Sequence, residues 1–370
     1  MNILHIEFDS VGSPLTGGGA IRNVALNSRL VRRGHNVIHL ASRYPGAKAR
    51  ETFDGIEVVR IGRETFPWNF IWWFFNSGRR ARAYEDWADL VVDDFTTPVG
   101  PTLCPLFLKR KPLVASVLFL NAWEMTKKYS IPFFLIERVL IRLYRNFTVL
   151  TPRQQILVLS KNPKARVRVF PCAVDQKYLA LPEKKEESFV LFIGRMDIDM
   201  KGIDLLLAAF RIAVRQRPDI KLKMIGHGRE EKRVLAMITD LQLSTHIDFV
   251  GPVPDVDKFD YILRSRFLVM PSRYEGFGIV ALEAFACSKT VIVFDIENLN
   301  QVVTRERGIV VKQFDVDEYA ANIISLWDDQ EKRRELGSRG KEYVSELQWD
   351  NITAELETFY SQVINKWTTD

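Results

Sequence analysis

The sequence predicts two α/β domains, each built on a parallel, doubly wound sheet. Short apolar runs alternate with amphipathic helical stretches through both halves of the chain, which is typical of parallel α/β sheets. A length of 370 residues is long for a single hydrophobic core and favours two domains. Because ligands bind beyond the carboxyl ends of parallel strands, we expect the functional residues in loops that follow strands.

The expected strands of the first half are 2–7, 36–41, 90–93, 113–118 and 146–150. A helix is expected from about Gly19 to Arg33, where Gly34 favours its end. In the second half the expected strands are 189–193, 221–225, 247–250, 267–270 and 290–294, and a helix fits 203–215. The charged segment 182–188 indicates an inter-domain linker. We therefore expect domains at 1–180 and 181–350.

Charge is divided unevenly between these two expected domains. Residues 1–180 carry a net charge of +12 and residues 181–370 a net charge of −6, within the total of +6. This segregation indicates that the two domains meet different partners, although ordinary solvated surface explains part of it. No nucleic acid partner is expected.

The cysteines and the apolar stretches indicate a cytoplasmic protein that does not cross a membrane. Cys104, Cys172 and Cys287 are odd in number and widely spaced, which favours a reducing compartment and no structural metal site. The amino terminus lacks the pattern of a signal peptide. The uncharged stretch 65–78 would span about 21 Å as a helix, which is short of a bilayer core of about 30 Å.

The first glycine cluster follows the expected strand 2–7. Gly17, Gly18 and Gly19 precede a helix, where main-chain N–H groups can approach an anion. A flexible turn would explain the same cluster. A dinucleotide fingerprint needs glycine three places after Gly19, where Arg22 stands, and this argues against an NAD enzyme.

Two cations follow the expected strand 189–193. Arg195 and Lys201 are six residues apart, between Gly194 and Gly202. A planar guanidinium and a compact ammonium together could hold a diphosphate leaving group. A pair of solvated surface charges is the alternative.

The third feature is the segment 271–284, PSRYEGFGIVALEA, which follows a buried strand. Gly276 and Gly278 free the main chain just before a helix, whose amino terminus can face a phosphate. Glu275 can accept hydrogen bonds from sugar hydroxyls. Glu283 lies in an otherwise apolar helix, where a carboxylate is costly unless it is paired or bound to a ligand; an exposed stripe of that helix is the alternative.

Together these motifs resemble the large family of retaining GT-B glycosyltransferases, which includes lipid-linked mannosyltransferases, sucrose-phosphate synthase and relatives of glycogen synthase. The motifs that carry the resemblance occur in the family's order along nearly the whole chain: residues 17–19, Gly194-Arg195, Lys201-Gly202, Gly226-His227-Gly228, residues 250–253, Pro271-Ser272, and Glu275 with Glu283. The resemblance implies the GT-B fold, in which two Rossmann-like doubly wound domains face each other across a cleft. It also implies that 1–180 binds the acceptor, that 181–350 binds the donor, and that a final helix, 351–370, returns to the first domain.

The resemblance further implies a nucleotide-sugar donor held mainly by the second domain. Arg195 and Lys201 would hold the diphosphate and Glu275 the donor sugar, and these three are the expected catalytic residues. Glu283 would bind the ribose hydroxyls. The remaining expected donor contacts are Gly17, Gly18, Gly194, Gly226, Val253, Phe277, Gly278 and Ile279.

Two positions depart from the family's pattern. Many relatives carry a histidine near the donor sugar where this chain has Leu118, so that contact is absent here or moves to Asn121. The sequence Pro-Cys-Ala-Val-Asp at 171–175 replaces the usual Pro-Asn-Gly-Val-Asp at the hinge. Gly19, Arg22 and Asn121 are the residues expected on the acceptor side.

No general base stands out, which agrees with the front-face retaining mechanism of the family. In that mechanism the departing phosphate itself accepts the acceptor's proton, and the protein supplies positioning and charge. No DxD-type metal motif lies in a suitable loop, so we expect no obligatory metal and no cofactor beyond the nucleotide-sugar co-substrate. Asp93 and Asp94 follow an expected strand, where we expect them to cap or order a loop.

Two aromatic and basic segments of the first domain indicate contact with an anionic membrane surface. The segment 67–75 contains three tryptophans and three phenylalanines, and 131–145 combines apolar residues with arginines. Trp72, Trp73 and Phe74 are the expected membrane contacts of the first segment. Burial of either segment inside the domain is the alternative. We expect peripheral association with the inner face of the membrane.

The sequence therefore predicts a retaining, metal-independent hexosyltransferase. It would move a sugar from a nucleotide diphosphate sugar, with a UDP-sugar the first expectation and GDP-mannose the second, to a lipid-linked or membrane-proximal glycan. A GT-B sugar phosphorylase or nucleotide-sugar epimerase is one alternative. A non-catalytic sugar-binding subunit of the same fold is another, against which the retention of both cations and both glutamates argues.

Overall fold

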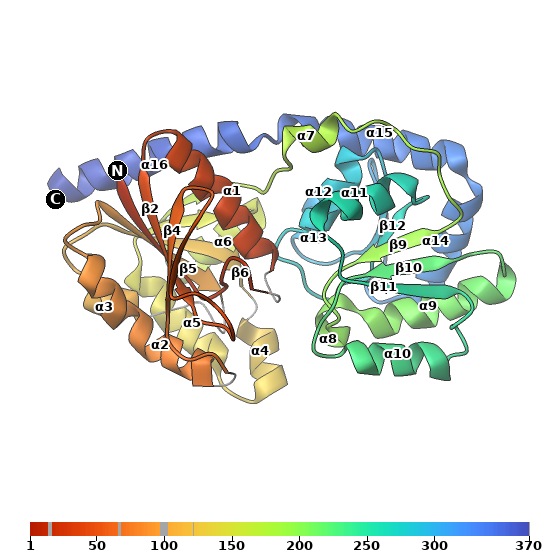
Figure 1. The fold of residues 1–370 in the computed structure, drawn as a ribbon, viewed down its shortest axis with the longest axis horizontal. Coiled ribbons are helices and arrows are strands. Elements are labelled where there is room, and N and C mark those ends of the chain that lie inside the picture. Colours follow the sequence, from red (N-terminus) through yellow and green to blue (C-terminus); the bar gives the residue numbers. More distant parts are fainter. Residues whose placement is uncertain (14–16, 66–67, 97–102, 121, 370) are drawn as a thin grey trace. The chain divides into compact units, whose positions relative to one another are not determined.

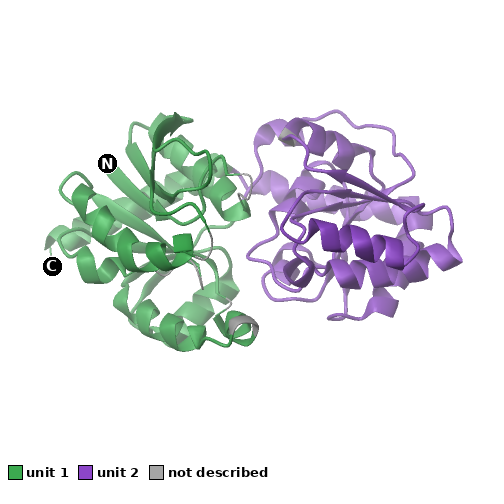
Figure 2. Cartoon of the chain, turned by 60° about the horizontal axis from the view of Figure 1, so that its bottom comes forward, with its two compact units in different colours: residues 1–172, 349–370 green, residues 173–348 purple. Residues whose placement is uncertain are grey.

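The computed structural model describes residues 1–370 except 14–16, 66–67, 97–102, 121 and 370. The chain forms two compact units (Figure 2): unit 1 contains Met1–Cys172 and Trp349–Asp370, and unit 2 contains Ala173–Gln348. Each unit is a Rossmann-like α/β domain (Figure 1), as the alternating pattern of the sequence predicts. The divisions fall after residues 172 and 348, where the sequence analysis places them after 180 and 350.

The sheet of unit 1 has eight strands within the described residues. In spatial order they are β3 (Arg50–Phe53), β4 (Ile56–Ile61), β2 (Asn36–Ser42), β1 (Asn2–Glu7), β5 (Leu90–Thr96), β6 (Leu113–Phe119), β7 (Asn146–Val149) and β8 (Arg166–Val169). Neighbours are parallel except β3 and β4. The five strands expected in this half are confirmed to within three residues at each end.

Three strands of this sheet were not predicted. β3 and β4 form a hairpin whose turn residues Asp54 and Gly55 have φ of +47° and +81°, and an Asp-Gly pair favours this type of turn. β3 and β8 lie at the two edges of the sheet; β3 is largely exposed, and two of the four residues of β8 are exposed. Edge strands are often rich in charged residues, which interrupts the apolar pattern that reveals central strands.

Helices cover both faces of this sheet (Figure 1). They are α1 (Gly18–Arg32), α2 (Trp68–Ala81), α3 (Cys104–Phe107), α4 (Ala122–Tyr129), α5 (Phe133–Leu140), α6 (Pro152–Lys161) and α16 (Trp349–Thr369). The predicted end of α1 is confirmed: Gly34 follows it with φ of +89° and donates its N–H to the carbonyl of Val31 (2.9 Å). α16 packs against α1, and its Glu357 accepts from His35 (2.9 Å).

The described sheet of unit 2 is parallel throughout. In spatial order its strands are β11 (Ile247–Gly251), β10 (Leu222–Ile225), β9 (Val190–Ile193), β12 (Leu268–Met270), β13 (Val291–Phe294) and β14 (Ile309–Val311). Of these strands only β14, which lies at an edge of the sheet, was not predicted. The helices are α7 (Gln176–Leu179), α8 (Ile198–Lys201), α9 (Ile203–Gln216), α10 (Glu231–Asp240), α11 (Asp255–Arg264), α12 (Ile279–Ala286), α13 (Leu299–Val302), α14 (Val316–Asp328) and α15 (Gln330–Glu346).

The charged segment 182–188 is part of unit 2 and not the linker that its composition indicates. Three of its charged residues are paired with residues of that unit. Lys184 forms an ion pair with Asp260, and Glu186 accepts from Arg333 (2.8 Å). A charged segment that pairs with a folded surface can have the same composition as a solvated linker, so the sequence does not distinguish the two.

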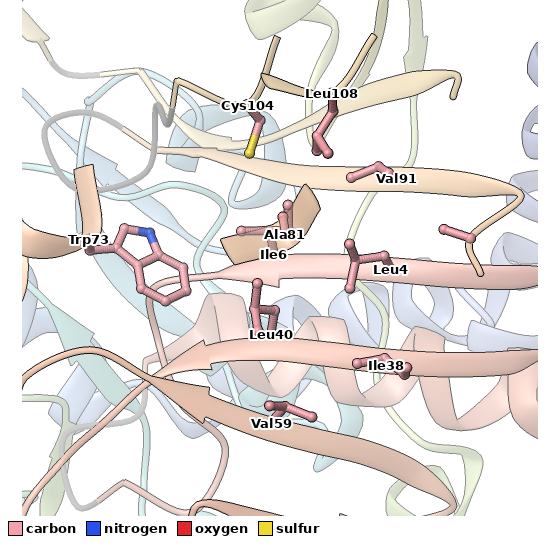
Figure 3. Close-up of a cluster of buried hydrophobic side chains, with 11 residues drawn as sticks. Leu4, Ile6, Ile38, Leu40, Val59, Trp73, Ala81, Val91, Cys104 and Leu108 are labelled. Atoms are coloured by element: carbon pink, nitrogen blue, oxygen red, sulfur yellow. The ribbon is translucent and has the colours of Figure 1, made fainter. Parts of the chain in front are cut away.

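The core of unit 1 on the side of α2 is apolar (Figure 3). It joins side chains of four strands to helices α2 and α3: Leu4, Ile6, Ile38, Leu40, Val59, Val91, Trp73, Ala81 and Cys104, with Leu108 beside them. Trp73 is 1% exposed, so the expectation that Trp73 contacts a membrane is wrong. Phe74 packs partly buried against the neighbouring cluster that contains Leu140.

The exposed face of α2 is nevertheless apolar. Trp68, Ile71 and Phe75 are 57%, 43% and 56% exposed, and their spacing places them with the exposed Arg79 on one stripe of the helix. α5 likewise exposes Phe134, Leu135 and Val139 while it buries its other face. In the described part of the chain, every helix is too short or too polar to span a bilayer.

A buried polar network lies between the other face of the sheet and α1. Nδ2 of Asn27 is 2.7 Å from Nδ1 of His5 and 2.5 Å from Nε2 of His39. Nε2 of His5 donates to Oδ1 of Asp94 (3.0 Å), whose Oδ2 accepts from Asn23 (2.8 Å). The amide of Asn27 thus contacts one ring nitrogen of each histidine. Burial and the nearby His5 hold the pKa of His39 well below its usual range.

Asp93 and Asp94 lie inside β5, so the expectation that they cap a loop is wrong. Successive residues of a strand point to opposite faces. Asp93 accepts a hydrogen bond from Tyr144 (2.5 Å), whereas Asp94 joins the network under α1.

Glu7 is buried beside this network, with 2% of its surface exposed. Burial and the charges of Asp94 and Asp9 raise its pKa well above the usual range, against a smaller opposing effect of Asn23 and Arg22. The neutral form of Glu7 therefore persists to a higher pH in the folded protein than in the unfolded chain.

We predict that Glu7→Gln stabilises the protein, and more so at high pH. The carboxyl group loses its proton near pH 4.3 in the unfolded chain but keeps it to a higher pH in the folded one. The unfolded state then binds fewer protons, so the free energy of unfolding of the wild type falls by up to about 1.4 kcal/mol per pH unit above that value. Glutamine does not titrate, so the variant lacks this dependence. Urea unfolding between pH 5 and 9 measures the difference.

Glu137→Gln is the matched control for this experiment. Glu137 is an equally buried glutamate of unit 1, but it forms an ion pair with Lys161, so its neutral substitute should destabilise the protein. The neutral His39 destabilises the fold only below about pH 6.5, and it does so in wild type and variants alike. A Glu7→Gln difference that stays constant across the pH range would show that Glu7 is ionised.

Candidate functional site

The expected donor-side residues of unit 2 follow four adjacent strands. Gly194, Arg195 and Lys201 follow β9, Gly226 follows β10, Val253 follows β11, and Glu275, Phe277, Gly278, Ile279 and Glu283 follow β12. The carboxyl ends of parallel strands lie at one edge of a sheet, and the order β11-β10-β9-β12 makes the four loops neighbours.

Direct main-chain contacts hold the loops after β9 and β10. Gly226 has φ of +131°, and its N–H donates to the carbonyl of Gly251 (2.9 Å). A Cβ at Gly226 would lie 1.9 Å from the carbonyl oxygen of Gly194, so only glycine fits. Met196 of one loop also donates its N–H to the carbonyl of His227 in the other (3.0 Å).

The short helix α8 places Lys201 next to the loop after β12. Asp197 begins the helix by accepting from the N–H of Met200 (2.9 Å). Gly202 ends it in the left-handed region, with φ of +60°, where a Cβ would lie 2.0 Å from the carbonyl oxygen of Pro271. The main chains of the two loops therefore touch directly beside Lys201.

Lys201 and Glu275 form an ion pair. Nζ of Lys201 is 2.5 Å from Oε1 of Glu275, and the two side chains are 18% and 12% exposed. Ser272 donates its hydroxyl to the same carboxylate oxygen (2.9 Å). Little water reaches these charges, so their interaction is stronger than that of a surface pair. The structure thus brings two of the three expected catalytic residues into contact.

A second ion pair holds the same loop. Arg273 binds Asp204 through two nitrogens of its guanidinium group (2.8 and 2.7 Å). The main-chain N–H of Arg273 donates to the carbonyl of Met200 (3.0 Å). Burial alone would raise the pKa of Asp204, but the hydrogen bonds and charge of Arg273 hold it below the usual range. Arg273 is therefore a structural residue of the site.

Arg195, the third expected catalytic residue, is exposed beside these loops. No described residue forms a hydrogen bond or ion pair with its guanidinium. Its five N–H donors are thus available to a ligand that carries phosphate oxygens.

The segment between Glu275 and α12 presents a group of main-chain donors. Among the described residues, none accepts a hydrogen bond from the N–H of Gly276, Phe277 or Gly278. Gly278 has φ of +94° and precedes Ile279, the first residue of α12. Free N–H groups at a helix amino terminus bind anions and hydroxyl oxygens.

Glu283 lies buried in α12, 8% exposed, and forms an ion pair with Lys258 of α11 (2.7 Å). A buried carboxylate is expected to need a partner, and Lys258, which the sequence analysis did not identify, is that partner. Val253 is half-buried in the loop after β11.

Unit 1 contains the remaining expected residues. Gly17 and Gly18 stand at the start of α1, and a Cβ at Gly19 would lie 2.6 Å from Cδ1 of Leu118, so Leu118 packs on the first turn of that helix.

Arg22 is 3% exposed and donates to the carbonyl of Phe170 (3.2 Å), so its guanidinium supports the segment after β8. Asn121 lies outside the described residues.

The edge of unit 2 can bind an anion next to a group rich in hydroxyls. Arg195 and Lys201 supply positive charge, Gly276 to Gly278 supply N–H donors, and Glu275 supplies acceptors. Within the described ranges, no three His, Cys, Asp or Glu side chains lie close enough together to hold a metal ion.

Sequence reasoning missed the residues that support the site. Ser272, Asp204 and Lys258 each contact a side chain that the motifs identify. Ser272 stands in a quoted motif, so its proximity to Glu275 could have been inferred. Nothing in the sequence indicates the pairing of Lys258 with Glu283, because it depends on how α11 packs on α12.

Family comparisons match the chain in two parts. The model described as Glycosyltransferase Family 4 matches residues 16–178, and the one described as Glycosyl transferases group 1 matches residues 176–343. The two matches meet close to the division between unit 1 and unit 2.

Among curated proteins, a GDP-mannose-dependent monoacylated alpha-(1-6)-phosphatidylinositol monomannoside mannosyltransferase of Corynebacterium glutamicum is 33% identical over 159 residues, 41% of each chain. The chain spans about half the length of the first curated relatives it matches.

Solved structures share the fold over the whole chain. Sucrose-phosphate synthase from Thermosynechococcus elongatus superposes with a TM-score of 0.81 at 20% identity, covering 99% of this chain and 100% of that one. HepE from Anabaena, in complex with UDP and glucose, gives a TM-score of 0.74 at 16% identity, covering 97% and 99%. With two Rossmann-like domains and these matches in sequence, the chain has the GT-B fold of glycosyltransferases; residues 176–343 belong to the glycosyl transferases group 1 family and residues 16–178 to glycosyltransferase family 4.

Proposed function

We propose that the protein transfers a hexose from a nucleotide diphosphate sugar to an acceptor hydroxyl, with retention of the anomeric configuration and without an obligatory metal. The observation that carries the proposal is the contact between Lys201 and Glu275, beside the free N–H groups that precede α12. This arrangement places a cation for a phosphate next to a carboxylate for sugar hydroxyls. Arg195 adds a second cation.

A UDP-sugar is the first candidate donor and GDP-mannose the second. The solved HepE structure contains UDP and glucose, whereas the relative from Corynebacterium is named for GDP-mannose. Glu283, with Lys258 bound to it, would accept hydrogen bonds from the ribose hydroxyls. That contact is common to both nucleotides, so the residues described here favour a nucleoside diphosphate without choosing the base.

The reaction breaks the bond between the sugar's anomeric carbon and the β-phosphate oxygen, which keeps the electron pair. Arg195, Lys201 and the N–H groups before α12 would stabilise the charge that develops on that phosphate. The acceptor oxygen attacks the same face of the sugar, and its proton passes to the departing phosphate. Glu275 would position the sugar through its hydroxyls, and no protein side chain is required as the base.

The acceptor is proposed to be a lipid-linked or membrane-proximal glycan. Unit 1 exposes apolar stripes on α2 and α5, and arginines such as Arg79 and Arg138 accompany them. Apolar side chains with adjacent cations suit the surface of an anionic membrane. The relative named for a phosphatidylinositol monomannoside has a lipid acceptor in its name. We place the protein in the cytoplasm, at the inner face of the membrane.

Arg195→Ala and Lys201→Ala should each lower turnover by on the order of 10²-fold, because each removes a donor to the leaving phosphate. Arg195 is exposed, so its variant should fold like the wild type. Lys221→Ala is the matched control, since Lys221 lies at the amino end of β10, the opposite edge of the sheet. Initial rates with UDP-glucose and GDP-mannose measure the effect, and near-normal turnover in both variants would remove the central argument.

The product should carry its sugar in the donor's anomeric configuration, and EDTA should leave activity largely unchanged. Proton NMR of the product reports the configuration through the coupling of the anomeric proton. An inverted product would contradict the proposed front-face reaction. Activity that disappears with EDTA and returns with Mg²⁺ or Mn²⁺ would contradict the metal independence.

Membrane binding should depend on the exposed stripe of α2 and weaken with salt. Replacing Trp68, Ile71 and Phe75 together by Ser should abolish sedimentation with anionic liposomes, while nucleotide-sugar binding stays intact. Replacing three scattered exposed aliphatics, Ile156, Leu235 and Val256, by Ser is the matched control and should have no effect. If the wild-type protein does not sediment with phosphatidylglycerol vesicles at low salt, the result would indicate a soluble acceptor.

A further inference from the structure

Asn298 has an unusual main-chain conformation next to the candidate site. It precedes α13, with φ of +69° and ψ of −47°, a region that residues other than glycine rarely occupy. Such conformations persist only where the surrounding structure requires them, and they gather at functional sites. Asn298 is half-buried, so its side chain is not simply solvated.

The side chain of Asn298 contacts the loop that carries Glu275. Its Nδ2 donates to the main-chain carbonyl of Glu275 (3.2 Å). The next residue, Leu299, supports the other end of the same segment, because its Cδ1 lies 2.6 Å from the position of a Cβ at Gly278. The loop after β13 therefore holds the segment 275–278 at both ends.

This contact fixes the direction of a donor. In a planar trans peptide, the carbonyl of one residue and the N–H of the next point in opposite directions. Holding the carbonyl of Glu275 therefore aims the N–H of Gly276 away from Asn298. Gly276 has no Cβ, so without this hydrogen bond the peptide could rotate to other orientations. The carboxylate of Glu275 is held separately, by Lys201 and Ser272.

We propose that Asn298 is a positioning residue for the part of the site that binds the donor sugar, an inference that rests on the proposed function. Through its contact with the carbonyl of Glu275, Asn298 acts by orienting the peptide between Glu275 and Gly276. It should therefore affect the sugar and its transfer, and leave the binding of the nucleoside diphosphate unchanged.

Asn298→Gly separates this role from a conformational one. Glycine adopts positive φ without strain, so the variant should be as stable as the wild type or more stable, but it lacks the amide donor. We expect turnover with UDP-glucose or GDP-mannose to fall by about tenfold, the equivalent of one hydrogen bond, with affinities for UDP and GDP within twofold of the wild type. Asn298→Asp, which tolerates the same conformation but cannot donate when ionised, should show the same loss.

Gln242→Gly is the matched control. Gln242 also has positive φ, +58°, but it is exposed after α10 and precedes the amino end of β11. Its variant should gain stability in the same way and keep full turnover. Thermal unfolding, calorimetric affinities and initial rates are measured on all four proteins.

The outcomes separate the two proposals. Wild-type protein that binds neither donor overturns the proposed function, and the role of Asn298 with it. If the wild-type protein is active and the Asn298→Gly variant has the same turnover, only the proposed role of Asn298 is overturned. Loss of UDP and GDP affinity together with turnover in that variant also overturns it, because the residue would then support the whole site.

Discussion

Contact between one main chain and another, without side chains between them, determines the form of the candidate site. At Gly202 and at Gly226 the approach of a neighbouring carbonyl leaves no room for a Cβ. The loops after β9, β10 and β12 are consequently held at fixed separations, which is what allows Lys201 to reach Glu275. Ion pairs such as Arg273 with Asp204 add to this arrangement, but they can form only because the loops already touch.

The sequence predicts the features that are local in the chain, and misses those that depend on distant partners. Central strands and glycine loops carry their signal in a few consecutive residues, so all ten expected strands begin within one residue of the observed starts. The network under α1 is different. His5, Asn27 and Asp94 come from three elements, and each alone is only a polar residue in an apolar stretch. Asn298 has no local signal of its contact with Glu275 either.

The aromatic helix α2 shows an error that the sequence itself could have prevented. Trp72, Trp73 and Phe74 are consecutive, and consecutive residues of a helix point in directions about 100° apart. They cannot all face the same surface, and Trp73 belongs to the core. Residues three and four apart, such as Trp68, Ile71 and Phe75, share a stripe. The composition of the segment indicated an exposed aromatic surface, and the helical periodicity determines which of its residues form that surface.

Unit 2 is an insertion within unit 1, since the chain returns to unit 1 for its final helix. α16 buries Phe359, Tyr360 and Val363 in unit 1. A ribosome makes the chain from its amino terminus, so unit 2 is available as a complete segment before α16 exists. Unit 1 cannot complete its fold until α16 is made, and until then the surface that receives α16 is uncovered. A chain released before α16 is made would therefore contain a complete unit 2 and an incomplete unit 1. This truncated chain would be the species most vulnerable to proteases and aggregation.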